Sequence, residues 1–313
     1  MDSSYDTHQY NRKKIMIAID LGSNTIRFIE HDGVRWGKSY EKIVRAAESL
    51  HATNMICDNA VSRICLAIEE AQSKLDFLEQ DVVAVTTAAL RMASNGVDVI
   101  AEIFKRTGVK FTIIDGTREA ELTLLAVKNR LQELKINSDQ FCLADIGGGS
   151  SELIYYNHSK LDSISLPIGI VTMSEEAIST NNLQLLLSNF EDKIHVFHDS
   201  LGKDVQDFRL VLTSGTPTTI AAYRMGMNYT NYDANQINGS RLTLTDCQQT
   251  YLELMDMDES TRAMYVGVGR EILIATGILM VESLFKSLNT DEAIIVDDGL
   301  REGVALDYWE SIR

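Results

Sequence analysis

Hydrophobic positions along the chain follow two periods, and their alternation predicts an α/β fold. Continuous apolar runs at residues 15–20 and 141–145 each end in an aspartate and a glycine-containing turn, which is typical of buried strands. Further strands are predicted at 25–31, 34–44, 82–86, 110–114, 151–156, 161–166, 209–212 and 293–296. Helical spacing predicts helices at 59–78, 97–107, 118–134, 184–197, 218–225, 246–255, 269–288 and 300–309.

The opening of the chain repeats in its second half. The two matching turns are Asp20-Leu21-Gly22-Ser23 and Asp145-Ile146-Gly147-Gly148. They lie 145 − 20 = 125 residues apart, each between a buried strand and a predicted hairpin. Such a repeat indicates an internal duplication. We therefore predict two domains, 1–136 and 137–313, with residues 1–14 as a flexible polar tail and the last helix as a candidate to pack on the first domain.

Composition limits the classes of partner. The 313 residues carry 29 Lys+Arg and 45 Asp+Glu, a net charge of −16, which argues against non-specific binding to nucleic acid or to a membrane surface. No apolar run is long enough for a membrane span, and the polar start does not resemble a secretory signal. The four cysteines form no CxxC pair, so buried thiols in a reducing compartment are expected. The sequence thus predicts a cytoplasmic protein.

The strand-end turns offer a local device for holding an anion. A glycine lets backbone N–H groups approach a phosphate, and a neighbouring hydroxyl adds a donor. An aspartate at the strand end suits hydrated Mg²⁺, which binds through one or two carboxylates together with phosphates. One such turn is more often only a tight hairpin. A third turn, Ser214-Gly215-Thr216, follows another apolar run. Three turns converging on one cleft would surround a phosphate chain with neutral donors in an otherwise acidic protein.

Several motifs in one order make the chain resemble a known family. They are Ala18-Ile19-Asp20-Leu21-Gly22-Ser23-Asn24, Thr87-Ala88-Ala89-Leu90-Arg91 with Ala93 and Asn95-Gly96, Gly116-Thr117-Arg118-Glu119-Ala120, Asp145-Ile146-Gly147-Gly148-Gly149-Ser150-Ser151-Glu152, Ser214-Gly215-Thr216, and Asp298-Gly299-Leu300-Arg301-Glu302-Gly303. In this set the sequence is similar to the exopolyphosphatase / guanosine pentaphosphate phosphatase family of the acetate kinase–actin–Hsp70 superfamily. The resemblance covers almost the whole chain.

The resemblance implies two ribonuclease-H-like (actin-like) domains with mixed sheets and an active site in the cleft between them. It implies an Mg²⁺-dependent hydrolase of a terminal phosphoanhydride bond, acting on inorganic polyphosphate or on guanosine pentaphosphate. By likeness, Glu119 positions or deprotonates the attacking water, which Asp145, Glu152 and Asp20 help to organise, and the metal lies at Asp20 and Asp145. The implied phosphate-binding residues are Ser23, Asn24, Arg91, Gly147, Gly148, Gly149, Ser150, Ser214, Gly215 and Thr216. A homodimer is the assembly that the family suggests.

Taken one at a time, the same residues also fit ordinary structural roles. Glu119 lies near the start of a predicted helix, where an acidic residue favours the helix dipole. Glu152 fits a solvated strand position, and Arg91 fits a pair with a surface carboxylate. His195 and His198 are three residues apart but have no third ligand nearby, so a solvated helix face is expected there.

Two departures from the family pattern bear on activity. Arg118 stands where relatives usually have an acidic residue, and its charge is expected either to lower the pKa of Glu119 or to bind phosphate. Ile272 replaces an acidic residue that often follows the arginine in relatives. These two departures leave open the alternative that the protein is a catalytically weak regulatory module that binds an alarmone. An actin-like ATPase or filament protein is a further alternative, against which Glu119 and the order of the motifs argue.

Overall fold

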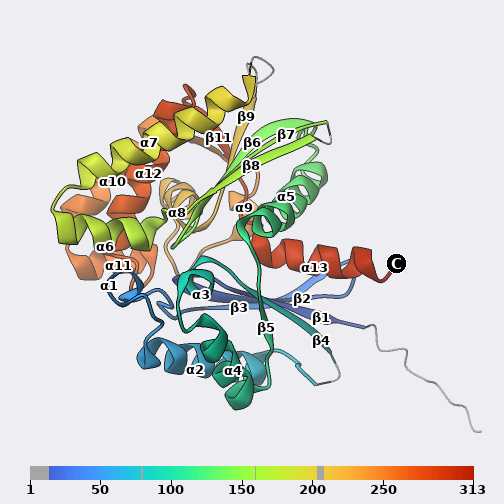
Figure 1. Cartoon of the computed structure of the whole chain (residues 1–313). Helices are drawn as coiled ribbons and strands as arrows, with labels where there is room; N and C mark the ends of the chain where they lie inside the picture. The colour runs from blue at the N-terminus through green and yellow to red at the C-terminus, as the bar shows by residue number, and fades with distance from the viewer. Residues whose placement is uncertain (1–13, 79, 159, 203–207) are drawn as a thin grey trace, which may run out of the picture.

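The computed structural model describes residues 14–78, 80–158, 160–202 and 208–313. Residues 1–13 of the predicted tail lie outside this described part. Figure 1 shows two β-sheets, one above the other, with helices on both faces of each. Both sheets mix parallel and antiparallel pairs, so the predicted fold class is confirmed at this level.

The first sheet has the strand order β3-β2-β1-β4-β5. Its strands are β1 (Met16–Leu21), β2 (Thr25–His31), β3 (Trp36–Ile43), β4 (Asp81–Thr86) and β5 (Phe111–Ile113). The described helices in this half are α1 (Leu50–Thr53), α2 (Asp58–Lys74), α3 (Ala88–Met92) and α4 (Gly96–Thr107). Every expected strand and helix of this half is present, whereas the short helices α1 and α3 were not expected, because neither is long enough to show a helical period.

The second sheet has the order β10-β11-β9-β6-β7-β8. Its strands are β6 (Gln140–Ile146), β7 (Ser151–Asn157), β8 (Lys160–Leu166), β9 (Arg209–Thr213), β10 (Arg241–Thr243) and β11 (Glu292–Ile295). Helices of this half include α6 (Ile170–Thr180), α7 (Leu183–Ser200), α8 (Gly215–Arg224), α9 (Ala234–Ile237), α10 (Leu244–Asp256), α11 (Glu259–Val266) and α12 (Leu273–Ser287). The unexpected elements are α6, α9, α11 and β10. The helix predicted at 269–288 begins only at Leu273, since its first residues form a glycine turn.

Each sheet buries both faces, and the alternating side chains of its central strand divide between two cores. In β1, Ile17 and Ile19 pack in the core that includes α2 and α4, whereas Met16 and Ala18 face the last helix, α13 (Leu300–Ser311). Figure 1 shows α2 and α4 below the first sheet and α13 above it. The continuous apolar run of β1 is therefore explained by burial on both faces.

Two helices exchange partners between the halves of the chain. Helix α5 (Gly116–Glu133) precedes the predicted boundary but packs on the second sheet, through Leu124 and Val127. Helix α13 follows the second sheet in sequence but packs on the first, through Leu300 and Val304. The two helices cross where a Cβ on Gly303 would lie 2.0 Å from the backbone O of Leu122. Only glycine allows this approach, which joins the two halves beside the cleft.

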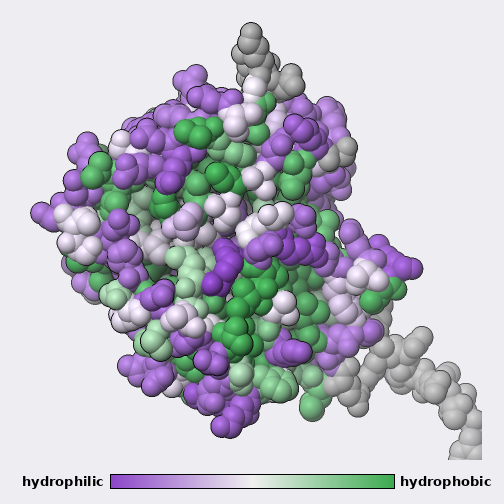
Figure 2. All heavy atoms as spheres, in the orientation of Figure 1, coloured by the Kyte–Doolittle hydropathy of each residue, from purple (hydrophilic) through white to green (hydrophobic). Residues whose placement is uncertain are grey.

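Surface polarity varies over the face drawn in Figure 2. Hydrophilic side chains dominate the outer helices, and a hydrophobic area lies in the lower middle, where Figure 1 draws the edge strand β5. Within the described residues no helix combines the length and hydropathy needed to cross a bilayer. All four cysteines are free thiols.

Candidate active site

The two duplicated turns meet across one cavity of about 140 Å³. They have the same local geometry: the N–H of Gly22 donates to Thr25 O at 3.0 Å, and the N–H of Gly147, 125 positions later, donates to Ser150 O at 2.9 Å. The turns also touch, because a Cβ on Gly149 would lie 2.4 Å from Ser23 Oγ. A side chain at Gly149 would therefore separate the loops, which is the physical reason for glycine there.

The cavity gathers most of the site residues predicted from the sequence. Its lining includes Asp20, Ser23, Asn24, Glu119, Asp145, Gly147, Gly148, Gly149, Ser150, Glu152, Ser214, Gly215 and Thr216. Three carboxylates come from the second sheet or the helix that packs on it. Asp145 in β6 lies directly across from Glu152 in β7, and Glu119 lies in the first turn of α5. The close approach of Gly116 to Ser165, whose hydroxyl donates to Glu152 Oε1 at 2.7 Å, sets that turn beside β8.

Burial shifts the proton affinity of these carboxylates. It raises the pKa of Asp145 to about 6, and that of Asp20 to about 6 against the opposing charge of Arg27. The pKa values of Glu119 and Glu152 are also raised, first by burial and then by neighbouring carboxylates. Their exposed fractions are 8% and 2%, so Glu152 is not the solvated strand residue of the simpler interpretation. Four acids with raised pKa values in one cavity repel one another unless a proton or a cation is present.

Arg91 contacts the site through Glu119. Its Nη1 donates to Ile114 O at 2.8 Å and to Glu119 Oε2 at 3.3 Å. Arg91 is not among the residues that line the cavity. In this structure its guanidinium therefore holds a buried carboxylate, and whether it also contacts phosphate stays a prediction.

The expectation for Arg118 was wrong. Its guanidinium pairs with Asp307 at 2.6 Å and with Glu121 at 3.1 Å, on the side of α5 that faces α13. It neither lines the cavity nor contributes to the pKa of Glu119, which is raised and not lowered. The side chain of Ile272 is likewise outside the cavity and 64% exposed. Both departures lie outside the site.

The sequence analysis missed two arginines that line the cavity, Arg27 and Arg270. Arg27 lies directly across from Asp20 on β1 and from Glu41 on β3, so the three side chains form an acid–base–acid row across the sheet. The available signal was a lone arginine inside the apolar strand β2. Arg270 ends the glycine turn before α12, and its guanidinium would lie 3.5 Å from a Cβ on Gly215.

The third turn is the start of a helix, so the predicted helix start at residue 218 was wrong. Helix α8 begins at Gly215, immediately after Ser214, whose φ is 83°. The first backbone N–H groups of α8 have no partner within the helix and carry its positive dipole end. Since Ser214, Gly215 and Thr216 line the cavity, this terminus adds donors for an anion.

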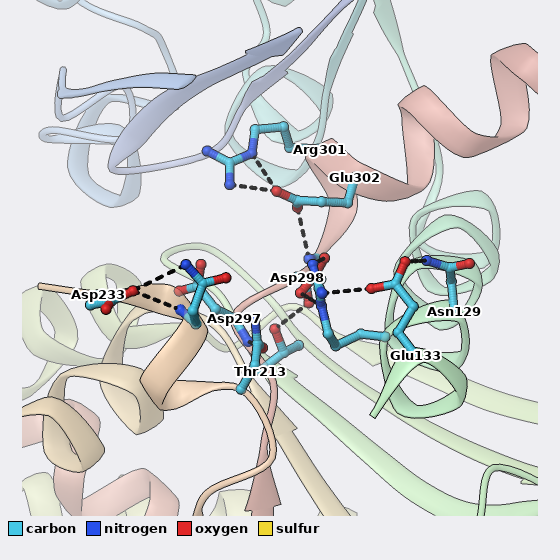
Figure 3. A network of polar contacts seen from close by, with 12 residues as sticks. Asn129, Glu133, Thr213, Asp233, Asp297, Asp298, Arg301 and Glu302 are labelled. Carbon is cyan, nitrogen blue, oxygen red and sulfur yellow. Dashed lines mark hydrogen bonds and ion pairs between the residues drawn. The ribbon is translucent and has the colours of Figure 1, made fainter. Parts of the chain in front are cut away.

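A network of polar contacts holds the opposite wall of the cavity, which contains Gly299 and Leu300 (Figure 3). Arg130 on α5 binds Asp298 with two hydrogen bonds of 2.7 and 2.9 Å. Glu302 Oε2 accepts the N–H of Gly299 at 3.0 Å, and Thr213 Oγ1 donates to Asp298 O at 2.9 Å. The turn between β11 and α13 is thereby attached to both α5 and the second sheet.

Comparison with known proteins identifies the family. The model of the Ppx/GppA phosphatase family matches residues 38–311. The chain belongs to this family. It is 26% identical to exopolyphosphatase 2 of Mycobacterium tuberculosis over 317 residues, covering 92% of this chain and 97% of that protein. It is also 26% identical to exopolyphosphatase 1 of Mycobacterium leprae over 312 residues, with coverage of 94% and 89%.

Solved structures of Ppx/GppA proteins share the fold. An exopolyphosphatase from Cytophaga hutchinsonii superposes with a TM-score of 0.82 at 22% identity, covering 96% of this chain and 99% of that chain. A Ppx/GppA family member from Aquifex aeolicus gives 0.73 at 23% identity, with the same coverage. The two-domain, actin-like Ppx/GppA fold expected from the resemblance is therefore confirmed.

The Ppx/GppA cavity has donors that fit Mg²⁺. The described residues contain no group of three or more His, Cys, Asp or Glu side chains arranged as a complete metal site. Mg²⁺ does not need one, because it commonly binds one or two carboxylates and completes its shell with water and phosphate oxygens. Asp20 and Asp145, half-buried acids with raised pKa values that line the same cavity, supply oxygen donors of this kind.

Proposed function

We propose that this Ppx/GppA protein is an exopolyphosphatase, which hydrolyses the terminal phosphoanhydride bond of inorganic polyphosphate with the help of Mg²⁺. The observation that carries the proposal is the buried carboxylate of Glu119 in the same cavity as two touching glycine turns and the start of α8. Neutral N–H donors suit the phosphates of a chain, and a carboxylate beside them suits a water molecule. The names of the mycobacterial relatives support polyphosphate as the substrate.

In this proposal the chain's own residues provide a base and donors. Glu119 orients the attacking water and accepts its proton, and its raised pKa makes it a stronger base than a solvated glutamate. Arg91, bonded to Glu119 Oε2, keeps the carboxylate in place. The N–H groups of the two turns and of α8 hold the phosphate oxygens, while Arg27 and Arg270 supply positive charge at the cavity wall.

Asp20 and Asp145 would hold Mg²⁺, which supplies charge that neutralises phosphate oxygens during phosphoryl transfer. Without a cation, the pKa of Glu119, raised to about 9 by burial and by the neighbouring carboxylates, favours its protonated form near neutral pH. A protonated Glu119 accepts no proton from water. Activity should therefore depend on a divalent cation.

Phosphate release from tripolyphosphate and from longer chains tests the proposal. Wild type should release phosphate with Mg²⁺ and not with EDTA, and Glu119→Gln should lower kcat by about 10²–10⁴-fold. The matched control is Glu121→Gln, on the same helix but exposed and paired with Arg118, which should stay within about twofold.

Two outcomes would contradict different parts of the proposal. Equal rates for wild type and Glu119→Gln would refute the role of Glu119. Release from guanosine pentaphosphate but from no polyphosphate would refute the substrate and leave the catalytic assignment standing.

A further inference from the structure

The cavity is too small to enclose a long phosphate chain. Its volume of about 140 Å³ is below the roughly 300–1,000 Å³ of pockets that surround a drug-sized ligand. A longer chain must therefore continue beyond the cavity, over residues that do not line it. The acidic protein as a whole repels that part of the chain, so its path should follow local positive charge.

Arginines at the cavity wall differ in how far their charge is already neutralised. Arg27 pairs with Glu41 at 3.6 Å, and Glu41 also accepts a hydrogen bond from Tyr229 at 3.1 Å. Although burial alone would raise it, the pKa of Glu41 is lowered by the charges of Arg27, Arg270 and Arg301. Glu41 thus occupies one side of the arginine group with a negative charge, which disfavours a phosphate chain there.

Arg45 comes from the first half of the chain and lies against the residue before Arg270. Its Nη2 would be 2.8 Å from a Cβ on Gly269, the residue before Arg270. The absence of a side chain at Gly269, whose φ is 90°, is what lets the guanidinium rest against the second half. Arg45 is exposed. In the part of the chain that the structure describes, neither Arg45 nor Arg270 forms an ion pair, although the Glu271 carboxylate accepts the N–H of Gly269 nearby.

Backbone hydrogen bonds connect the segment around Arg45 to the first of the two duplicated turns, at Ser23 and Asn24. The N–H groups of Val44 and Arg45 both donate to Asn24 O, at 2.8 and 2.9 Å, and Ala47 N–H donates to Ser23 O at 2.8 Å. Arg63 holds the same segment from outside, with Nε donating to Val44 O at 2.7 Å. The position of the Arg45 side chain is therefore tied to the loop that faces the terminal phosphates.

We propose that Arg45 is a chain-length-determining residue: with Arg270, it binds phosphate groups of the substrate that lie outside the cavity. This inference rests on the proposed function and extends it. The Arg45 guanidinium lies against Gly269, and the guanidinium of the next residue, Arg270, lines the cavity; within the described residues neither forms a salt bridge. A phosphate bound between them joins the halves, so long chains gain a contact that short ones lack.

Arg45→Gln tests the proposal, because it removes the guanidinium and its charge, keeps a polar side chain and leaves the backbone hydrogen bonds of the segment in place. Arg106→Gln is the matched control: Arg106 is exposed on α4 and far from the lining residues in the fold. Both variants change the net charge equally. Binding of long-chain polyphosphate and of tripolyphosphate is measured by calorimetry at low ionic strength with Mg²⁺, together with KM and kcat for both.

Arg45→Gln should weaken binding of the long chain about tenfold, the size expected for one lost charge-assisted contact. It should change tripolyphosphate binding less than about threefold, and its effect should appear in KM and not in kcat. Equal weakening of both ligands, or equal binding of the long chain by the Arg45 and Arg106 variants, overturns the proposal. Binding does not require turnover. An inactive wild type would therefore refute the proposed function, whereas the binding measurements would still test the role of Arg45.

Discussion

Gly149→Ala should displace parts of the site, and the structure gives the size of the displacement. The new Cβ would lie 2.4 Å from Ser23 Oγ and 3.1 Å from the Cβ of Ala88. Reaching an ordinary contact of about 3.4 Å requires about 1 Å of movement, either of the Ser23 hydroxyl or of the turn that carries it. Both turns hold the substrate in the proposed mechanism, and a misplacement of about 1 Å can cost on the order of 100-fold in rate. Overpacking of this kind also costs about 1–3 kcal/mol of stability.

Gly22→Ala is the matched control for this prediction. Gly22 is the glycine of the first turn and corresponds to Gly147, and the nearest atom to its Cβ would be Thr25 O at 3.5 Å. Neither glycine has a positive φ, so alanine introduces no backbone strain at either position. Phosphate-release kinetics should show a loss of about 10–100-fold in kcat/KM for Gly149→Ala and less than about threefold for Gly22→Ala.

A double-mutant cycle separates steric damage from loss of a donor. Ser23→Gly removes the hydroxyl that is closest to the new methyl group, so combining it with Gly149→Ala should recover part of the rate lost by Gly149→Ala alone. Additive losses in the double variant, or equal rates for Gly149→Ala and Gly22→Ala, would show that the turns do not constrain each other as the structure describes.

Three further perturbations test the scaffold and the buried acids. Arg130→Ala leaves the buried Asp298 carboxylate without its two hydrogen bonds and should destabilise the protein by about 3–5 kcal/mol in denaturant unfolding. The control Arg241→Ala breaks an exposed ion pair and should cost less than about 1 kcal/mol. Equal losses in the two variants would show that the Arg130–Asp298 pair does not stabilise the fold as a buried pair should. Gly303→Ala should lower the unfolding temperature more than any of the turn variants, because its Cβ meets backbone at 2.0 Å. The pKa values of Asp20 and Asp145 rise from 3.8 to about 6 on folding, so these two carboxyls bind more protons in the folded chain between about pH 4 and 6, and the stability that they contribute in EDTA should fall as the pH rises through that window. Because other acids, such as Glu41 and Asp81, have lowered pKa values and act in the opposite direction, this contribution is measured as the stability of wild type minus that of an Asp20→Asn/Asp145→Asn variant. Added Mg²⁺ should restore stability at pH 7.5, and a difference that rises with pH across the window would refute these shifts.

Much of this site could be predicted because its signals are local. An apolar run followed by Asp and Gly requires a buried strand that ends in a tight turn, whatever surrounds it, and the recurrence 125 residues later predicts a second turn of the same kind. Glu119 was indicated by the resemblance to the family, because an acid near the start of a helix also fits the helix dipole. The start of α8 was misplaced because Ser214-Gly215-Thr216 reads as a turn, whereas tertiary packing continues the helix back to Gly215.

Other features depended on the tertiary structure alone. The packing of α5 on the second sheet leaves no trace in sequence order, whereas α13, which packs on the first sheet, was named in the sequence analysis as a candidate for that position. Arg118 and Arg91 resemble each other as charges in the sequence, yet one pairs with Asp307 on α13 and the other with Glu119.

The sequence by itself determined the duplicated strand–turn units, since these follow from residue type and spacing within a few positions. The order of its motifs carried the resemblance that indicated the family and the roles of the acids and glycines. Only the tertiary structure decided which charges share the cavity. The partners of Arg27, the position of Arg45 against Gly269 and the raised proton affinity of the acids all depend on which distant segments exclude water from them. Burial and Coulomb interactions act through space, so they cannot be derived from separation along the chain.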